Sequence, residues 1–167
     1  MSNTLDWDDW EQRLALHWVD FGHMDAAAFV ERLEALAAEL PDGDPIGLFE
    51  QASAQDSLGN EANAAPLYRQ ALAGGLSGTR RRRATIQLAS TLRNLGQIDE
   101  SIALLEAERA MPSDELDDAV VAFLALSLVD AGRPQEAGGL ALGRLARHLP
   151  RYNGSLKRYA DALLPNA

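Results

Sequence analysis

The sequence predicts an all-α protein, in which about four helical hairpins stack into an α-solenoid (an α-α superhelix) that ends in a C-terminal capping helix. An apolar residue followed by glycine occurs four times, and Gly22, Gly59, Gly96 and Gly132 are 37, 37 and 36 residues apart. Helix pairs that recur at a fixed period of this length are typical of solenoids. Aromatic residues make up only 6% of the chain and there are only 7 prolines. This composition favours close-packed helices over sheets or disorder.

The first helical pair is predicted from two amphipathic runs. In residues 6–21 the large apolar side chains fall at steps of three and four, which places them on one side of a helix: Trp7, Trp10, Leu14, Trp18 and Phe21. Gly22 ends this helix, and Asp25 is placed to cap a second one that extends to about Leu40. The aromatic row favours burial in the first core layer, and an exposed anchor for a partner is the alternative.

The second pair follows a loop at residues 41–43. Asp44 before Pro45 indicates an N-cap and a first helical position, for a helix that extends to Leu58. Its partner helix is expected over residues 63–73, because proline is tolerated only near a first turn and Pro66 lies there. Ala64, Tyr68 and Ala71 lie four and three residues apart, so they share one helix face. This small, large, small row suits a helix that presses on the preceding one and fills the gap beside it.

The third and fourth pairs follow a glycine-rich connection at residues 74–78. Thr79 is expected to cap a long helix to Leu95, and Asp99 to cap the helix after it. Ser113 or Asp114 is expected to cap a very apolar helix to Ala131. Its segment 119–129 predicts burial, with a hydrophobic groove as the alternative. Pro134 begins a helix to about His148, and a short helix is expected over 155–164. The predicted repeat units span about residues 5–41, 44–76, 79–112 and 113–149, with a cap over 153–165, in a single domain of residues 1–167.

These residues and spacings resemble the tetratricopeptide repeat (TPR) family. The second unit matches the family pattern best, and the first unit, with Glu31 where a bulky residue is usual, matches it least. The matching residues of the second unit are Leu48, Ala52, Leu58, Gly59, Ala64, Tyr68 and Ala71. The chain resembles short bacterial proteins with a tetratrico peptide repeat group 5 domain, although its period exceeds the usual length of about 34 residues. The resemblance implies a scaffold or adaptor that binds a peptide or helix of another protein in a concave groove, lined by the first helix of each pair.

The same resemblance implies the partner-binding residues. On the third unit they would be Arg83, Gln87, Ser90, Arg93 and Asn94, and on the second unit Phe49, Ser53 and Asp56. Arginine and asparagine one turn apart can hold a carboxylate by charge-assisted hydrogen bonds, so an acidic partner fits them. Arg93 is the leading residue of this hypothesis. A solvated polar helix face is the alternative interpretation.

Charge and composition narrow the classes of function. The formal net charge of −10 disfavours binding to nucleic acid or to an anionic membrane, and the run 80–83 of four arginines is expected to pair with neighbouring acids. A chain with no cysteine has no disulfide and no thiolate metal site, which is compatible with a cytoplasmic location. We see neither a signal peptide nor an apolar run of the roughly 18 residues that a membrane span needs.

The uneven charge distribution suggests a second hypothesis. Residues 1–45 contain 11 acids and two arginines, whereas residues 131–167 contain six basic residues and two acids. These ends could attract each other, in a homodimer or another self-associating structural protein without a peptide ligand. The three histidines lack metal-ligand spacing, and no nucleophile context is present. We therefore expect no metal, no cofactor and no enzymatic activity, and we rank a small-ligand binder or an enzyme third.

Overall fold

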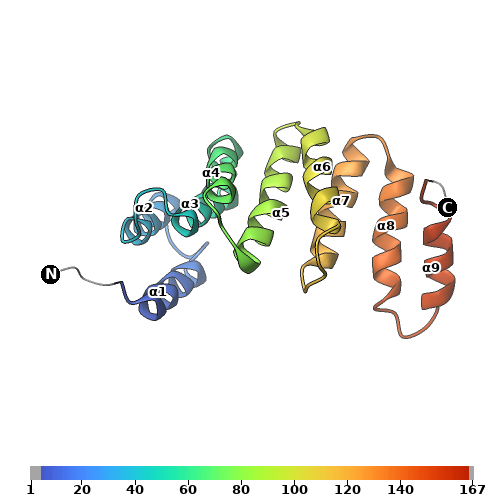
Figure 1. Cartoon of the computed structure of the whole chain (residues 1–167), viewed down its shortest axis with the longest axis horizontal. Helices are drawn as coiled ribbons and strands as arrows, with labels where there is room; N and C mark the ends of the chain where they lie inside the picture. Colours follow the sequence, from blue (N-terminus) through green and yellow to red (C-terminus); the bar gives the residue numbers. More distant parts are fainter. Residues whose placement is uncertain (1–4, 166–167) are drawn as a thin grey trace. The chain divides into compact units, whose positions relative to one another are not determined.

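The computed structural model describes residues 5–165, and every regular element in this range is a helix. The prediction of an all-α protein is confirmed for this part of the chain, while the outermost residues of the predicted 1–167 domain lie outside the described range. In chain order the helices (Figure 1) are α1 (Trp7–Val19), α2 (Ala26–Ala37), α3 (Pro45–Ser57), α4 (Glu61–Ala73), α5 (Gly78–Asn94), α6 (Ile98–Arg109), α7 (Asp117–Asp130), α8 (Pro134–Ala146) and α9 (Asn153–Asp161).

The chain divides into two compact units, one ending at Ala84 and one beginning at Thr85, so that the boundary falls inside α5. In the first unit α1 packs on α2, α2 on α3 and α3 on α4. In the second unit α6 packs on α7, α7 on α8 and α8 on α9, and Figure 1 shows the last three side by side. Within each unit these helices thus pack on their sequence neighbours, as stacked hairpins require. The predicted single domain with four repeat units stays a prediction.

The periodic glycines end three helices in the same way. Gly59, Gly96 and Gly132 have φ angles of 76°, 77° and 74° and stand two residues after the ends of α3, α5 and α7. The residue after each glycine donates its N–H to the carbonyl five positions earlier, at 2.8–2.9 Å. This closure needs a left-handed residue, which explains the glycine. Gly22 also has a positive φ, but α1 already ends at Val19, so its turn is longer.

Aspartate side chains begin several helices, and here the predictions were partly right. Asp25 accepts hydrogen bonds from two N–H groups at the start of α2, and Asp44 does the same for α3, with Pro45 at the first helical position. Pro134 begins α8 as predicted. Asp99 does not cap α6, because the helix begins at Ile98 and Asp99 lies inside its first turn. There its negative charge interacts favourably with the positive end of the helix dipole.

Four further helix starts differ from the predictions, among them α9, which begins two residues early at Asn153. α4 begins at Glu61, two residues early, so that Pro66 lies inside the helix. α5 already includes Thr79, since it begins at Gly78. α7 begins at Asp117, and the two predicted caps belong to the turn before it: the Ser113 hydroxyl donates to Asp117, and Asp114 accepts from the Leu116 N–H.

The core of the first unit holds the aromatic row. Trp10 is 1% exposed, packs with Phe29 and Leu33, and donates its indole N–H to the Leu36 carbonyl at 2.9 Å. Trp18 and Phe21 are half-buried, whereas Trp7 is 45% exposed. Burial in the core layer therefore explains this row, apart from its first member.

The core of the second unit is aliphatic, with Leu105, Leu124 and Leu128 completely buried. A buried hydroxyl pair lies at its centre. Ser101 donates to the Ala89 carbonyl at 2.7 Å and lies 2.9 Å from the hydroxyl of Ser127. Because these residues come from α6, α5 and α7, the hydroxyls join three successive helices.

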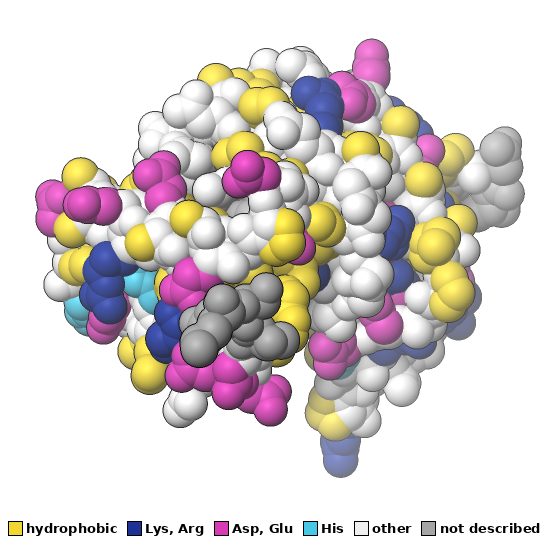
Figure 2. Space-filling view, turned by 60° about the vertical axis from the view of Figure 1, so that its left-hand side comes forward, with side chains coloured by type: hydrophobic (Ala, Val, Ile, Leu, Met, Phe, Trp, Pro, Cys, Tyr) yellow, Lys and Arg dark blue, Asp and Glu magenta, His cyan; other side chains and the backbone are white. Residues whose placement is uncertain are grey.

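The surface around the N-terminal helices is acidic. Figure 2 brings this side of the molecule forward and shows acidic side chains, in magenta, among exposed hydrophobic ones in yellow. The hydrophobic residues of α1 that are most exposed are Leu16 at 60% and Val19 at 73%. Asp20 follows Val19 directly, and Asp8 lies in the first turn of the same helix; both are exposed.

Candidate partner-binding face

Two of the eight predicted partner-binding residues are buried. Phe49 is completely inaccessible and Ser53 is 3% exposed, so the expectation that both lie on an exposed face is wrong. Phe49 stands 37 residues before Ile86, which is also buried, and the repeat period therefore places it on the core side of α3. Ser53 donates to the Phe49 carbonyl at 2.9 Å and is covered by Tyr68.

Asp56 is half-buried and already has a hydrogen-bond donor within the protein. The Tyr68 hydroxyl lies 3.3 Å from the Asp56 carboxylate and 3.5 Å from the Ser53 hydroxyl, and it donates toward them. Burial raises the pKa of Tyr68 above its usual value, so the phenol keeps its proton. Tyr68, from the second helix of the same hairpin, therefore covers part of the side of α3 that was expected to be exposed.

Arg83 is exposed, but its guanidinium covers Phe49. Its Cζ atom lies 5.3 Å from the centre of the Phe49 ring, the geometry of a cation–π contact. The contact joins the start of α5 to α3 within the first unit. A partner carboxylate could still reach this guanidinium from the solvent side.

Arg93, the leading residue of the sequence hypothesis, pairs with an acid of the next repeat. Its Nε atom lies 2.6 Å from Oδ2 of Asp130, at the end of α7, and both side chains are only partly exposed. The Nε–H is not aligned with an acceptor, so the contact is an ion pair without a directed hydrogen bond. A partner acid would have to compete with Asp130 for this cation.

The other predicted residues of α5 lie on the same helix side as Arg93. Ser90 is half-buried and Asn94 is exposed, while Gln87 is half-buried and its side-chain oxygen has no hydrogen-bond partner among the described residues. Spacings of three and four residues align them along α5. The structure therefore brings Gln87, Ser90, Arg93 and Asn94 together in the second unit.

The expectation that segment 119–129 is buried, with a hydrophobic groove as the alternative, holds only in part, because α7 carries an exposed apolar row. Leu126 is 45% exposed, Val129 is 50% exposed, and Ala122 precedes them on the same side of the helix. Leu126 and Val129 stand 36 residues after Ser90 and Arg93, at the equivalent positions of the next hairpin. The Arg93–Asp130 pair joins the ends of the two rows. The repeat period was the signal that could have identified them, because the local sequence of α7 is apolar on almost every side.

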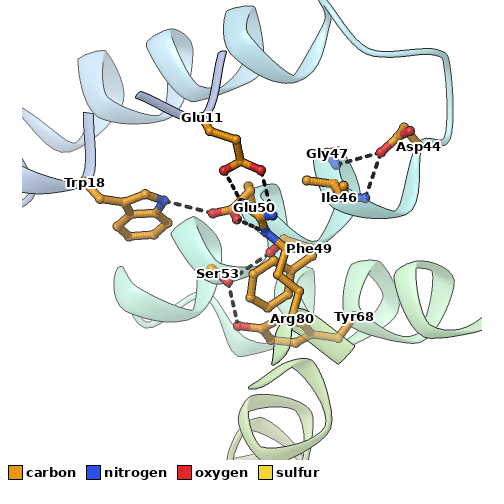
Figure 3. Close-up of polar contacts among 10 residues, drawn as sticks. All are labelled: Glu11, Trp18, Asp44, Ile46, Gly47, Phe49, Glu50, Ser53, Tyr68 and Arg80. Atoms are coloured by element: carbon orange, nitrogen blue, oxygen red, sulfur yellow. Dashed lines mark hydrogen bonds and ion pairs between the residues drawn. The ribbon is translucent and has the colours of Figure 1, made fainter. Parts of the chain in front are cut away.

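In the first unit the position equivalent to Gln87 is Glu50, which is 4% exposed and lies in a closed ionic network (Figure 3). The indole N–H of Trp18 donates to Glu50 at 2.9 Å, and Nε of Arg80 lies 3.2 Å from its other oxygen. The remaining guanidinium nitrogens of Arg80 hold Glu11 in a bidentate contact at 2.8 and 2.6 Å. The prediction that the arginine run pairs with neighbouring acids is confirmed for Arg80.

The pKa shifts of Glu50 and Arg80 reflect the burial and the ion pairs of this network. Burial raises the pKa of Glu50, and the indole of Trp18 and the cation of Arg80 oppose the rise. The hydrogen bonds that Arg80 donates to Glu11 are the largest cause that raises the pKa of Arg80. The network joins α1, α3 and the start of α5, over sequence separations of 30 to 69 residues. No local motif could have indicated it.

Other kinds of site find little support among the described residues. Within residues 5–165, no group of three or more histidine, aspartate or glutamate side chains is arranged to hold a metal ion. None of the described helices is both long and apolar enough to cross a membrane. On α5 and α7 the accessible groups are an amide, a hydroxyl, an ion pair and aliphatic side chains.

Comparison with known proteins agrees with the repeat architecture. A family model described as tetratrico peptide repeat matches residues 45–163, well over half of the chain. The match begins at the first residue of α3 and leaves out the first helical pair, whose glycine turn also differs from the other three. No curated protein and no solved structure matches the chain. The chain belongs to the tetratrico peptide repeat family.

Proposed function

We propose that this protein is a non-enzymatic interaction module that holds a helix or extended peptide of another protein along α5 and α7 of its second unit. Membership of the repeat family supports protein–protein interaction in general. The location rests on one observation, the exposed apolar row Ala122, Leu126 and Val129 beside the Arg93–Asp130 pair. We extend the proposal to a cytoplasmic setting, with which a chain without cysteine is compatible.

The composition of this face defines the kind of partner that fits it. Leu126 and Val129 lie one turn apart and about half of each side chain is exposed, so covering both would contribute roughly 1–2 kcal/mol. A partner with two apolar residues one turn apart matches this row. An acidic residue beside them could compete with Asp130 for Arg93, whose guanidinium remains partly accessible.

The first unit offers no equivalent opening. There Glu50 is buried under Trp18 and Arg80, and Ser53 lies under Tyr68. Displacing these side chains would deprive a buried carboxylate of its partners, at a large cost in free energy. The binding role of Phe49, Ser53 and Asp56 is therefore the least supported part of the sequence hypothesis, and Gln87, Ser90, Arg93 and Asn94 are the residues that we retain.

Site-specific photo-crosslinking in the native host tests the location. A photoreactive amino acid at position 126 should capture a partner, whereas the same group at Met111, which is 47% exposed on the loop after α6, should not. The crosslink at position 126 should disappear when Val129 is changed to Asp. Equal capture from both positions, or capture that survives Val129→Asp, would contradict the proposed face.

A further inference from the structure

The last helices of the second unit surround a cationic depression. It has a volume of about 320 Å³ and receives side chains from α6, α7, α8 and α9. Its charged lining consists of four cations and one acid, Arg109, Arg144, Arg147, Lys157 and Asp161, and Val121 and Leu140 are among its apolar residues. Leu126 and Val129 do not line it, so the depression is separate from the face proposed above.

Part of the positive charge in this depression is not neutralised. Arg144 pairs with Asp118 at 3.3 Å, and Lys157 pairs with Asp161 at 2.6 Å. Arg109 and Arg147 are exposed and have no ion-pair partner in residues 5–165. The depression therefore combines two free cations with an apolar floor, a combination that fits an acidic surface carrying exposed aliphatic side chains.

The first helical pair of the same protein has those properties. Residues 1–45 contain 11 acids and two arginines. Arg13 pairs with Asp9 and Glu39, and Arg32 lies 3.5 Å from Asp20. Other acids of the pair are exposed and have no ion-pair partner within the described range, among them Asp8 and Glu31.

The outer side of α1 adds aliphatic surface to this charge. Leu16 is 60% exposed and Val19 is 73% exposed. Leu16 lies on the opposite side of α1 from Trp18, which faces the ionic network inside the unit.

We propose that the protein associates with itself head to tail, the acidic outer side of α1 and α2 of one copy docking into the cationic depression of a second copy. The charge on the two surfaces is complementary, and Leu16 and Val19 can cover the apolar floor. Because the two surfaces differ, the contact is heterologous. Each dimer keeps one unused surface of each kind, so dimers extend into longer assemblies unless a ring closes.

Sedimentation velocity on the full chain tests this proposal. At about 0.02 M salt the weight-average sedimentation coefficient should rise with protein concentration. At about 0.5 M salt, where charges are screened within a few ångströms, the self-affinity should be at least about tenfold lower. Salt-independent association, or a monomer at low salt over the whole concentration range, would overturn the proposal.

Charge-reversed variants identify the two surfaces. The head variant Asp8→Lys/Glu31→Lys and the tail variant Arg109→Glu/Arg147→Glu should each be monomeric at low salt, with unchanged helical circular dichroism. An equimolar mixture of the two should associate again, because one intact acidic head and one intact cationic tail are present. Failure of this mixture to associate, while both variants are folded, would overturn the proposal.

Two control variants show whether association depends on these particular surfaces. Asp99→Lys/Glu115→Lys makes the same change in net charge as the head variant at exposed acids outside both surfaces, and it should associate like the wild type. Leu126→Asp/Val129→Asp should also self-associate normally. If only the Leu126/Val129 variant lost self-association, the contact would be assigned to α7 and the head-to-tail contact would be refuted. If this variant lost only the capture of another protein, the result would bear on the proposed function alone.

Discussion

Two hairpins have the same glycine turn but different side chains packed between their helices. One is α3–α4 in the first unit, and the other is α5–α6, whose contacts described here lie in the second unit. In α3–α4 the small position is Ala64 and the gap is filled by Tyr68, which packs against Phe49 with ring centres 6.3 Å apart. In the next hairpin the position equivalent to Ala64 is Ser101, whose hydroxyl bonds to α5. The glycine turn and a small residue are therefore what the repeat requires, while the remaining side chains are free to vary.

The same comparison extends to the first helix of each pair. In the first unit Ser53 is buried and Asp56 is half-buried beside Tyr68, whereas the residues that correspond to them in the second unit, Leu126 and Val129, are exposed. Equivalent positions of one repeat thus form a sealed surface in one unit and an accessible one in the other. The difference comes from a long side chain of the neighbouring helix, Tyr68 of α4, rather than from the helix that it covers.

Replacing the aromatic plug should have the largest effect on stability. Tyr68→Ala removes a completely buried ring, and we expect the free energy of unfolding to fall by about 3–5 kcal/mol. Tyr68→Phe keeps the ring and removes only the hydroxyl that donates toward Asp56, so a loss of about 1 kcal/mol is expected. Urea denaturation followed by circular dichroism measures both. Equal losses for the two variants would show that the hydroxyl, not the ring, stabilises the hairpin.

Removing Arg80 from the ionic network tests whether its charge stabilises the buried Glu50 in the first unit. Arg80→Ala leaves Glu50 buried with only the Trp18 indole as a side-chain donor. We expect a loss of about 2 kcal/mol, less than for a fully buried pair because Arg80 is itself a quarter exposed. The double variant Arg80→Ala/Glu50→Gln removes the buried charge as well and should recover part of the loss. A double variant no more stable than Arg80→Ala would contradict a seal that depends on charge.

Two neighbouring glycines in α8 should respond in opposite directions. A Cβ atom on Gly139 would lie 2.9 Å from the Ala160 carbonyl oxygen, whereas a Cβ on Gly138 would meet only Leu163, at 3.8 Å. Gly139→Ala should therefore destabilise the packing of α9 on α8, by about 1–3 kcal/mol. Gly138→Ala should stabilise the helix by about 0.5–1 kcal/mol. Thermal unfolding of both variants checks the contrast, which fails if they shift in the same direction.

The smallest expected effect is a pH dependence of the first unit. His17 is 2% exposed, stacks on Phe29 with ring centres 4.1 Å apart, and has its Nε2 atom 3.0 Å from the Phe29 carbonyl oxygen. Burial lowers the pKa of His17 below its usual 6.5 and Arg32 adds to this, while the Phe29 hydrogen bond and Asp20 oppose it. The neutral ring thus contributes stability that is present above pH 6.5 and is lost as pH falls through the folded-state pKa.

His17→Phe keeps an aromatic ring against Phe29 and removes the titrating group. The difference in unfolding free energy between wild type and variant should therefore change by about 1 kcal/mol or less between neutral and mildly acidic pH. Urea titrations at several pH values measure it. A difference that does not change with pH would show that His17 is not protonated on unfolding in this range.

Much of the backbone could be predicted from the sequence because its signals are local. Asp44 followed by Pro45 specifies the start of α3 through its own hydrogen bonds, and the glycine at each turn is required by a positive φ. Which side of each helix faces the core was harder to predict. Phe49, expected on the exposed side of α3, stands one residue before Glu50, the counterpart of Gln87, and one residue corresponds to about 100° around the helix axis.

The candidate site was predicted less well, because its chemistry depends on contacts between distant residues. Arg93 was identified correctly as a residue on the same side of α5 as Ser90 and Asn94, but its partner Asp130 is 37 residues away on α7. The cover of Glu50 comes from residues 32 positions before it and 30 positions after it. Local spacing carries no information about such pairs, although the repeat period would have identified Leu126 and Val129.

The glycine closures also bear on how such a chain can change in length. Each helical pair carries its own stop signal, and the closing hydrogen bond returns to a carbonyl of the same helix. A segment of one period, cut out or copied between two successive glycines, therefore brings a complete turn with it. Duplication or loss of genetic material in such blocks would lengthen or shorten the protein without creating a new kind of junction, and evolution could adjust its reach one hairpin at a time.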